Sequence, residues 1–187
     1  MKRACVAILS LLCAGCDGGR TSSPTGTPPP VVGSAESPPA APTELGPVHR
    51  LTVTDLDGKA VSLARFAGRP MIIEVWATWC GPCLANRRTV HAQRPSMPER
   101  VQVIGLSLDA DSARGRGADL VKGFLASNPA NDFEGMASPE FMDFIRTINP
   151  SNSIPKTLYV DSKGRVADLS EGTQSAKWLA AMAKNLK

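Results

Sequence analysis

Residues 74–83 read EVWATWCGPC, and this stretch decides how the rest of the chain is interpreted. Cys80 and Cys83 enclose a Gly-Pro pair directly after an apolar run with the length of a buried strand. Pro82 favours the first turn of a helix. A helix N-terminus stabilises a thiolate, and a second thiol one turn further on is near enough to attack a mixed disulfide. The pattern therefore predicts a redox couple in which Cys80 is the nucleophile and Cys83 is the resolving thiol.

The N-terminus has the organisation of a secretion signal over residues 1–15. Two basic residues precede an apolar run over residues 4–12, and Ala14-Gly15 supplies the small residues before Cys16. The run is far shorter than the roughly 20 residues that cross a bilayer. The ending LLCAGC resembles the bacterial lipobox, with Cys13 where an aliphatic residue is usual, so Cys16 is expected to carry a lipid. Ordinary signal cleavage, with Cys16 incidental, is the alternative.

Two other uses of the cysteine pair compete with redox chemistry. After residue 16 the chain offers two thiols and two histidines, His49 and His91, which lack the spacing of a four-ligand zinc site. A structural disulfide occurs in secreted proteins, but a bridge across three residues closes a tiny loop and removes little entropy from the unfolded chain. Redox chemistry is favoured over both, and no metal is expected.

The rest of the chain reads as a tether and one domain. Residues 16–47 combine the expected lipid anchor with a segment rich in Pro, Ser and Thr, whose composition does not support a packed core. Residues 48–187 form the domain, as suits a chain of 187 residues that is 42% hydrophobic. The formal net charge of +4 is spread along the chain without a dense basic tract, so no nucleic-acid partner is expected.

Within the domain the patterns predict strands and helices in alternation. Residues 51–63 form a hairpin around Asp57-Gly58, and a second hairpin lies near the C-terminus. The helix that starts at Ser138-Pro139 carries an apolar stripe formed by Phe141, Phe144, Ile145 and Ile148, which is expected to be core. A loop is expected between residues 128 and 138. The other expected strands are 71–79, 101–109, 156–161 and 165–170, and the other expected helices are 82–91, 118–128 and 175–186.

Three motifs together carry a resemblance to a known family. WATWCGPC at residues 76–83 is preceded by GRPMIIEV at 68–75 and followed much later by SIP at 153–155. The chain from residue 48 to 187 resembles the thioredoxin superfamily, and most closely its membrane-associated TlpA/ResA-type thiol-disulfide oxidoreductases. The first hairpin resembles the N-terminal β extension of that group and of peroxiredoxins. The resemblance implies an α/β fold, a thioredoxin-like mixed sheet with helices on both faces and this hairpin added.

The resemblance gives Glu74 a role. A buried acid stands six residues before the first cysteine in the thioredoxin pattern, and Glu74 matches that position. Burial raises the pKa of a carboxyl group, so Glu74 is expected to exchange a proton with Cys83. The alternative is an exposed strand position, but Glu74 alternates with Ile72 and Trp76, whose large apolar side chains favour burial.

The resemblance also implies which residues meet a substrate. Pro155 matches the family's cis-proline, which turns the backbone of Ile154 toward the cysteines, where an extended substrate segment can pair with it. Trp79 is expected to line the groove, with Gly81 and Pro82 also in contact with substrate.

Two further expectations concern the side chains around this site. Trp76 is expected in the core. Arg87 and Arg88 lie on the helix that follows the cysteines, where a solvated face is expected. They depart from the acidic and proline-containing helix common in the TlpA group, and the loop 149–153 departs from that group as well.

The expected function is an extracytoplasmic, lipid-anchored oxidoreductase on the periplasmic side of a bacterial membrane. It is expected to be a monomer that reduces protein disulfides, with a membrane thiol reductant upstream and no cofactor besides the Cys80–Cys83 redox disulfide. The resemblance suggests cytochrome c or cuproprotein maturation. A thiol peroxidase is one alternative, although Thr78 two residues before Cys80 supports it poorly. A copper-delivery protein is another, against which stands the lack of a well-placed histidine.

Overall fold

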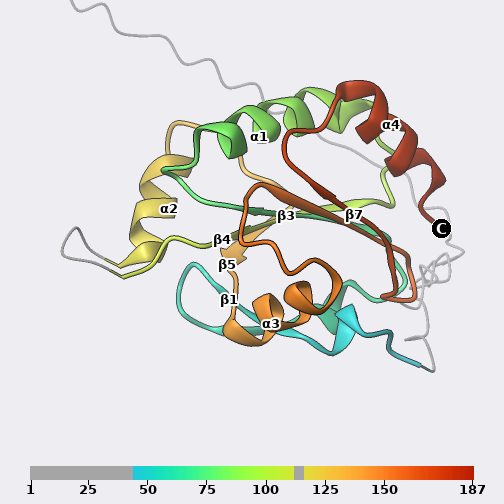
Figure 1. Ribbon diagram of the computed structural model, residues 1–187, viewed down its shortest axis with the longest axis horizontal. Helices are drawn as coiled ribbons and strands as arrows, with labels where there is room; N and C mark the ends of the chain where they lie inside the picture. Colours follow the sequence, from blue (N-terminus) through green and yellow to red (C-terminus); the bar gives the residue numbers. More distant parts are fainter. Residues whose placement is uncertain (1–43, 112–115) are drawn as a thin grey trace, which may run out of the picture. The chain divides into compact units, whose positions relative to one another are not determined.

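The computed structural model describes residues 44–111 and 116–187, and their centre is one seven-stranded mixed sheet (Figure 1). The strand order is β2-β1-β5-β4-β3-β6-β7. Helices α1 and α4 cover one face of the sheet and α3 covers the other. The expected α/β architecture is confirmed. The expected signal over residues 1–15, the lipidation of Cys16 and the tether up to residue 43 lie outside the described residues.

The elements alternate along the chain as the patterns predict. The strands are β1 Thr52–Asp55, β2 Ala60–Ser62, β3 Met71–Trp76, β4 Gln102–Ser107, β5 Phe133–Met136, β6 Lys156–Val160 and β7 Val166–Glu171. The α-helices are α1 Gly81–Gln93, α2 Gly117–Leu125, α3 Pro139–Ile148 and α4 Ala176–Asn185. Three single turns of 3-10 helix complete the list, η1 Val48–Arg50, η2 Leu63–Phe66 and η3 Arg94–Ser96. Of the described helices, none combines the length and the apolar character required to cross a membrane.

Strand β5 is the element that the sequence patterns miss. A loop is expected there, because FEGM is only four residues long and contains a glycine and a glutamate. Its partners make it a strand, since it pairs parallel with β4 and antiparallel with β1. Strand β5 therefore joins the first hairpin to the central strands, so that the hairpin is continuous with the main sheet.

Turns and helix caps follow the predicted residues. Gly58 and Gly164 occupy the two hairpin turns with φ of 85° and 79°, a conformation that favours glycine. Ser138 caps α3 by accepting a hydrogen bond from the backbone N–H of Phe141. The apolar stripe of α3 is buried at Phe141 and Ile145, but Ile148 is 42% exposed because it is the last residue of the helix.

The described domain starts with a docked segment. The backbone N–H of Gly46 donates to the carbonyl of Lys163 at 2.9 Å, and that of Val48 donates to Gly164 at 3.0 Å. A Cβ atom at Gly46 would lie 2.1 Å from the Lys163 carbonyl oxygen, so a glycine is required for this approach. The residues directly before the expected start at Val48 are thus bound to the second hairpin.

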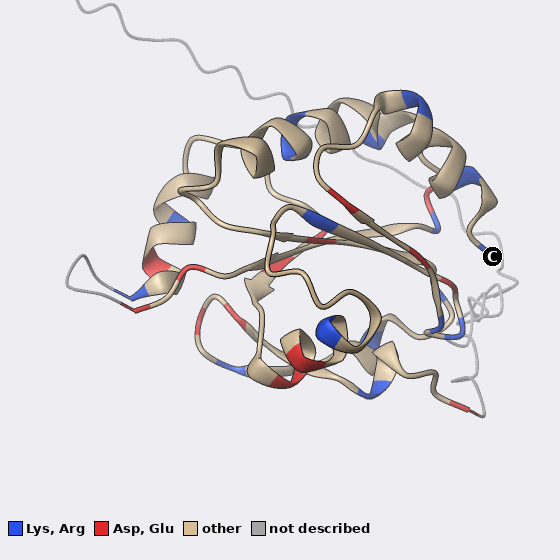
Figure 2. Ribbon diagram, viewed as in Figure 1, with Lys and Arg blue, Asp and Glu red and all other residues tan. Residues whose placement is uncertain are grey.

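The core has an apolar layer on each face of the sheet. All residues of β3, β4 and β6 are buried. Figure 2 shows charged positions of both signs on α2 and α3 and also within strands. Buried charged side chains among the described residues include Glu74, Arg87, Asp109 and Lys156. A buried charge is unfavourable unless a partner compensates it, and the partners of these side chains are described with the site below.

Candidate redox site

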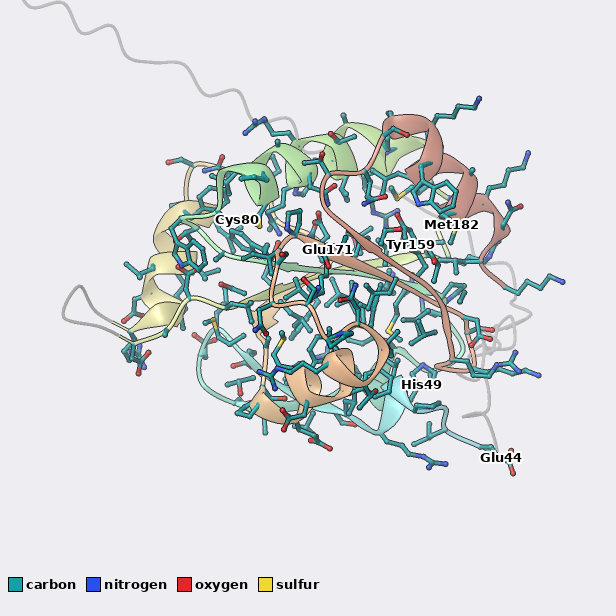
Figure 3. All side chains as sticks on the ribbon, in the orientation of Figure 1. Glu44, His49, Cys80, Tyr159, Glu171 and Met182 are labelled. Atoms are coloured by element: carbon teal, nitrogen blue, oxygen red, sulfur yellow. A yellow bond between two sulfur atoms is a disulfide. The ribbon has the colours of Figure 1, made fainter. Side chains whose placement is uncertain are left out.

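Cys80 and Cys83 form a disulfide at the start of α1 (Figure 3). Cys80 is the N-cap residue of the helix, and its Sγ accepts a hydrogen bond from the backbone N–H of Cys83 at 3.2 Å. Cys80 is 6% exposed and Cys83 is 1% exposed. Both residues are buried, and Cys80 at the helix N-terminus is the more exposed of the two.

The loop before β6 lies against this sulfur. The Ile154–Pro155 peptide bond is cis, as expected from the SIP motif. The carbonyl oxygen of Ile154 lies 3.9 Å from Cys80 Sγ, so the predicted approach of the Ile154 backbone to the cysteines is confirmed. Residues packed around the disulfide include Trp76, Ala77 and Val121, so the sulfurs lie in an apolar environment.

The residues predicted to meet a substrate are at the surface. Trp79 is 70% exposed, and Gly81 and Pro82 are also exposed. An indole this exposed can bind an apolar segment of another chain, and the role of all three residues stays a prediction. Trp76 is fully buried, as expected, with its ring 5.3 Å from that of Phe124.

Glu74 is 1% exposed, so the alternative of an exposed strand position is wrong. Its Oε1 accepts a hydrogen bond from Asn86 Nδ2 at 2.9 Å, and its Oε2 accepts one from Asn131 Nδ2 at 3.1 Å. Burial raises the pKa of Glu74 to about 7, and the Arg87 guanidinium at 3.8 Å opposes this rise. Asn86 follows Cys83 by one turn of α1, which links the carboxyl group to the helix that carries the resolving thiol.

Arg87 corrects the expectation of a solvated helix face. It is 3% exposed, whereas its neighbour Arg88 is exposed as expected. The Arg87 guanidinium pairs with Glu134 at 2.6 Å and lies 4.0 Å above the ring of Trp76. The interpretation failed because neither partner is local: Glu134 is 47 residues away and lies in the strand that the patterns missed.

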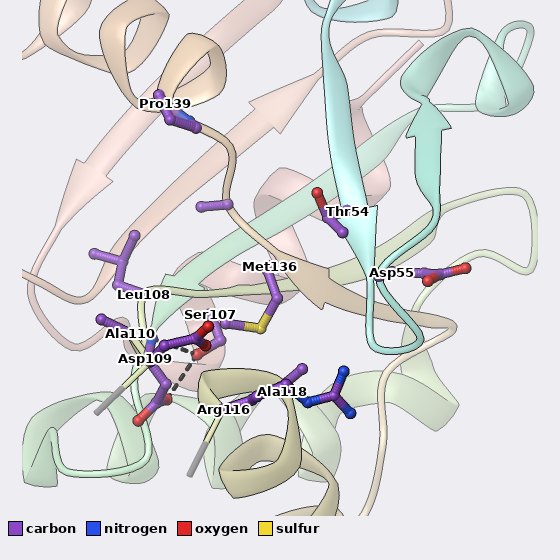
Figure 4. Close-up of a pocket in the computed structure, with 13 residues that line it drawn as sticks. Thr54, Asp55, Ser107, Leu108, Asp109, Ala110, Arg116, Ala118, Met136 and Pro139 are labelled. Atoms are coloured by element: carbon purple, nitrogen blue, oxygen red, sulfur yellow. Dashed lines mark hydrogen bonds between the residues drawn. The ribbon is translucent and has the colours of Figure 1, made fainter. Parts of the chain in front are cut away.

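Sequence reasoning also missed Asp109, which holds the loop that carries the cysteines. Its carboxylate accepts hydrogen bonds from the Thr78 backbone N–H at 2.8 Å and from the Thr78 hydroxyl at 2.6 Å. The hydroxyl of Ser107 donates to the same carboxylate at 2.7 Å (Figure 4). A carboxylate at the end of the expected strand 101–109 was the available signal. With two hydrogen bonds two residues before Cys80, Asp109 positions the start of the redox motif.

Lys156 holds the loop on the other side of the cysteines. It directly follows Pro155 and is 1% exposed, and its Nζ donates to Glu171 at 2.9 Å and to Asn149 at 3.3 Å. Ser151 donates to the other oxygen of Glu171 at 3.2 Å. The loop 149–153, which departs from the TlpA pattern, is thus tied to β7 by polar contacts.

A pocket of about 670 Å³ lies between the first hairpin and the end of β4 (Figure 4). Thr54, Ser107 and Met136 are among its lining residues, and neither cysteine is. Among residues 44–111 and 116–187 there is no group of three or more His, Cys, Asp or Glu side chains that could hold a metal ion.

The comparison with known families gives one match over most of the chain. The model of the family described as Redoxin matches residues 35–185. A relative described as thiol-disulfide oxidoreductase ResA, from Bacillus thuringiensis subsp. konkukian, is 27% identical over 135 residues. The alignment covers 72% of this chain and 73% of that protein.

Solved structures show the same fold. A thiol:disulfide interchange protein of the thioredoxin family from Chlorobium tepidum superposes with a TM-score of 0.62 at 21% identity, over 76% of this chain and 97% of that one. A secreted thiol-disulfide isomerase from Corynebacterium glutamicum superposes with a TM-score of 0.58 at 22% identity, over 73% and 83% of the two chains. The expected thioredoxin-like fold is thereby confirmed.

Proposed function

The chain belongs to the Redoxin family, and from that premise we propose that it is an oxidoreductase of the TlpA/ResA type that reduces protein disulfides through Cys80 and Cys83. One observation carries this proposal. The sulfur of Cys80, the more exposed residue of the disulfide, caps the N-terminus of α1 and lies 3.9 Å from the carbonyl oxygen before a cis-proline. A substrate segment that pairs with this backbone brings its own sulfur to Cys80.

The reaction is two thiol-disulfide exchanges. The Cys80 thiolate attacks a substrate disulfide, so that a mixed disulfide forms and the second substrate sulfur leaves as a thiolate. Cys83 then loses its proton and attacks Cys80 Sγ, which forms the Cys80–Cys83 bond and releases the first substrate sulfur. Two electrons pass from the protein dithiol to the substrate, and an external dithiol reductant returns them.

Glu74 is the base that we assign to the second exchange. Its carboxylate accepts the proton of Cys83, directly or through a water molecule, and returns it when the disulfide is reduced again. A pKa of about 7 suits this exchange, because both protonation states are then populated near neutral pH. One of the two donors to Glu74 is Asn86, which follows Cys83 by one turn of α1.

The cellular setting belongs to the same proposal. The signal-like start over residues 1–15 and the LLCAGC ending support a protein anchored by a lipid on Cys16 to the periplasmic side of a bacterial membrane. In this place a membrane thiol reductant regenerates the dithiol, and apocytochrome c or cuproprotein cysteines are suitable substrates. The Gly81-Pro82 spacer, which resembles that of reducing thioredoxins, supports the direction of electron flow.

Side-by-side assays separate this proposal from a thiol peroxidase. The full chain, with dithiothreitol as reductant, is expected to reduce insulin disulfides and to consume hydrogen peroxide no faster than a Cys80→Ser variant does. Thr78 favours this outcome, because both its N–H and its hydroxyl are bound to Asp109 and neither is free to polarise a peroxide. Rapid peroxide consumption without insulin reduction would establish the peroxidase instead.

A further inference from the structure

Two buried carboxylates share one arginine of helix α1. Arg87 Nη2 lies 2.6 Å from Glu134 Oε1, and Arg87 Nη1 lies 3.5 Å from Glu134 Oε2. The same Nη1 lies 3.8 Å from Glu74 Oε2. The exposed fractions of the three side chains are 3% for Arg87, 6% for Glu134 and 1% for Glu74. We name Glu74, Arg87 and Glu134 the buried charge cluster.

Strand register creates the space for this cluster. Gly105 of β4 pairs with Glu74 of β3 on one side and with Glu134 of β5 on the other. A Cβ atom at Gly105 would lie 2.1 Å from Glu134 Oε2 and 2.8 Å from Arg87 Nη1. The missing side chain of Gly105 therefore leaves room for the guanidinium between the two carboxylates.

Neutral groups fix the geometry of the cluster. Asn131 donates through Nδ2 to Glu74 at 3.1 Å and through its backbone N–H to Glu134 at 2.8 Å. The guanidinium lies 4.0 Å above the Trp76 ring, which holds it in place by a cation–π contact. Each carboxylate is thus bound in a defined position.

Further titratable side chains lie on β6, on α1 and before β5. On β6, burial raises the pKa of Tyr159, so its hydroxyl keeps its proton. On α1, burial and Arg87 lower the pKa of His91, which favours the neutral imidazole. Asp132, whose charge acts on His91, is paired with Arg94 at 2.8 Å.

The charges of the cluster do not cancel when both carboxylates are ionised. One cation faces two anions, and an uncompensated buried charge is unfavourable, so one proton is bound more tightly than in water. Glu134 has the shorter and twofold contact with Arg87. The extra proton therefore resides on Glu74, the partner at the longer distance.

We propose that Arg87 and Glu134 are positioning residues that set the pH at which Glu74 releases its proton, and thereby the pH range in which Cys83 resolves the mixed disulfide. The inference rests on the proposed function for its second half only. Its first half concerns the titration of one carboxyl group, which is measured without a substrate.

Charge removal at the two positions has opposite expected effects. In Glu134→Gln the only carboxylate of the cluster that faces Arg87 is Glu74, so the midpoint of the Glu74 titration falls by about one pH unit. Arg87→Gln removes the attraction, and the midpoint rises. The measurement is the carboxyl ¹³C NMR titration of the oxidised full chain, with the Glu74 signal assigned by its loss in Glu74→Gln. The exposed Arg88→Gln and Glu140→Gln are matched controls and leave the midpoint unchanged.

A double variant guards against loss of folding in Arg87→Gln, which leaves Glu134 buried without its partner. Arg87→Gln with Glu134→Gln removes one charge of each sign, and its midpoint is expected above that of Glu134→Gln. A midpoint of the Glu74 titration that is unchanged or higher in Glu134→Gln would overturn the inference. A midpoint in the double variant equal to that of Glu134→Gln would overturn the part assigned to Arg87.

Rates of mixed-disulfide resolution separate the two proposals. In each variant the pH dependence of this rate is expected to shift in the same direction as the midpoint of the Glu74 titration. A shifted Glu74 midpoint without a shift in the pH dependence of the rate would overturn the proposed proton exchange between Glu74 and Cys83. Unshifted midpoints in a chain that still reduces insulin would overturn the cluster alone.

Discussion

Glu74 lies inside β3 with 1% of its surface exposed, and its ionisation is unfavourable in the folded protein. Burial raises its pKa from 4.5 to about 7, while Arg87 and the two asparagine donors limit the rise. Between these two pH values the folded protein binds more protons at this site than the unfolded chain does. The stabilisation from the bound proton is fully present below pH 4.5 and is lost as the pH rises through about 7.

Replacement of Glu74 by glutamine removes this pH dependence. The free energy of unfolding of the oxidised wild type, relative to Glu74→Gln, is expected to fall by about 3 kcal/mol as the pH rises through this range. Urea unfolding at pH 4.5 and pH 8 measures it. The comparison cancels the effect of buried His49, whose lowered pKa acts in the opposite direction and is common to both proteins. A difference that is the same at both pH values would contradict the titration of Glu74, and Glu140→Gln serves as the exposed control.

Thr78 provides a second test at the scale of a residue. Thr78→Val keeps the shape of the side chain but removes its hydroxyl from the buried carboxylate of Asp109. The expected loss is about 1–3 kcal/mol in the free energy of unfolding, together with slower insulin reduction because the loop before Cys80 is less well held.

Thr89→Val on α1 is the matched control for Thr78→Val. The Thr89 hydroxyl donates only to the Ala85 carbonyl of its own helix, so a small change in stability and normal reduction rates are expected. Equal losses in both variants, measured by urea unfolding and insulin turbidity, would remove the positioning role from Asp109.

At the scale of an element, the middle of the sheet places the charged groups. Strands β3, β4 and β5 bring Glu74, Gly105 and Glu134 side by side, although they lie far apart in the sequence. Helix α1 adds Arg87 from above and carries both cysteines at its start. The redox pair and the buried charge cluster are therefore held by the same elements. A substitution in β4 is thus expected to affect the packing of α1.

Gly105→Ala tests this arrangement of strands. The added methyl group meets Glu134 and Arg87, and a loss of about 1–3 kcal/mol in the free energy of unfolding is expected from overpacking. Gly123→Ala is the matched control, because this helical glycine has no atom within 4 Å of the added Cβ. Its helix is expected to gain about 0.5–1 kcal/mol, since alanine has the higher helix propensity. The same sign for both variants in urea unfolding would contradict the described packing.

Sequence patterns within a short segment predicted most helices and strands. The exceptions depend on contacts with residues far away in the sequence. Gly58, Gly164 and Ser138 determine turns and a cap through their own chemistry, so their positions follow from the sequence. Strand β5 does not, because a four-residue segment with three partly exposed residues becomes a strand only through its pairing with β1 and β4. Periodicity within a short window contains no information about such partners.

At the scale of the whole domain, the site combines segments that a motif reveals with segments that only the fold brings together. Cys80, Cys83 and the cis-proline loop follow from short motifs. Asp109 and Glu134 contact the site across 31 and 47 residues, and the burial of Arg87 depends on the gap at Gly105. The chemistry of the sulfurs was therefore predictable, whereas the groups that adjust it required the structure.

The central claim is that Cys80 attacks the substrate and Cys83 resolves the resulting bond. Trapping tests it most directly: full-length Cys83→Ser, Cys80→Ser and the double variant are incubated with a disulfide substrate, and the linked peptide is identified by mass spectrometry. The Cys83→Ser variant is expected to accumulate an adduct on the peptide that contains Cys80, while the other two variants form none at either position. An adduct on Cys83 in Cys80→Ser, or no adduct in Cys83→Ser, would contradict the assignment.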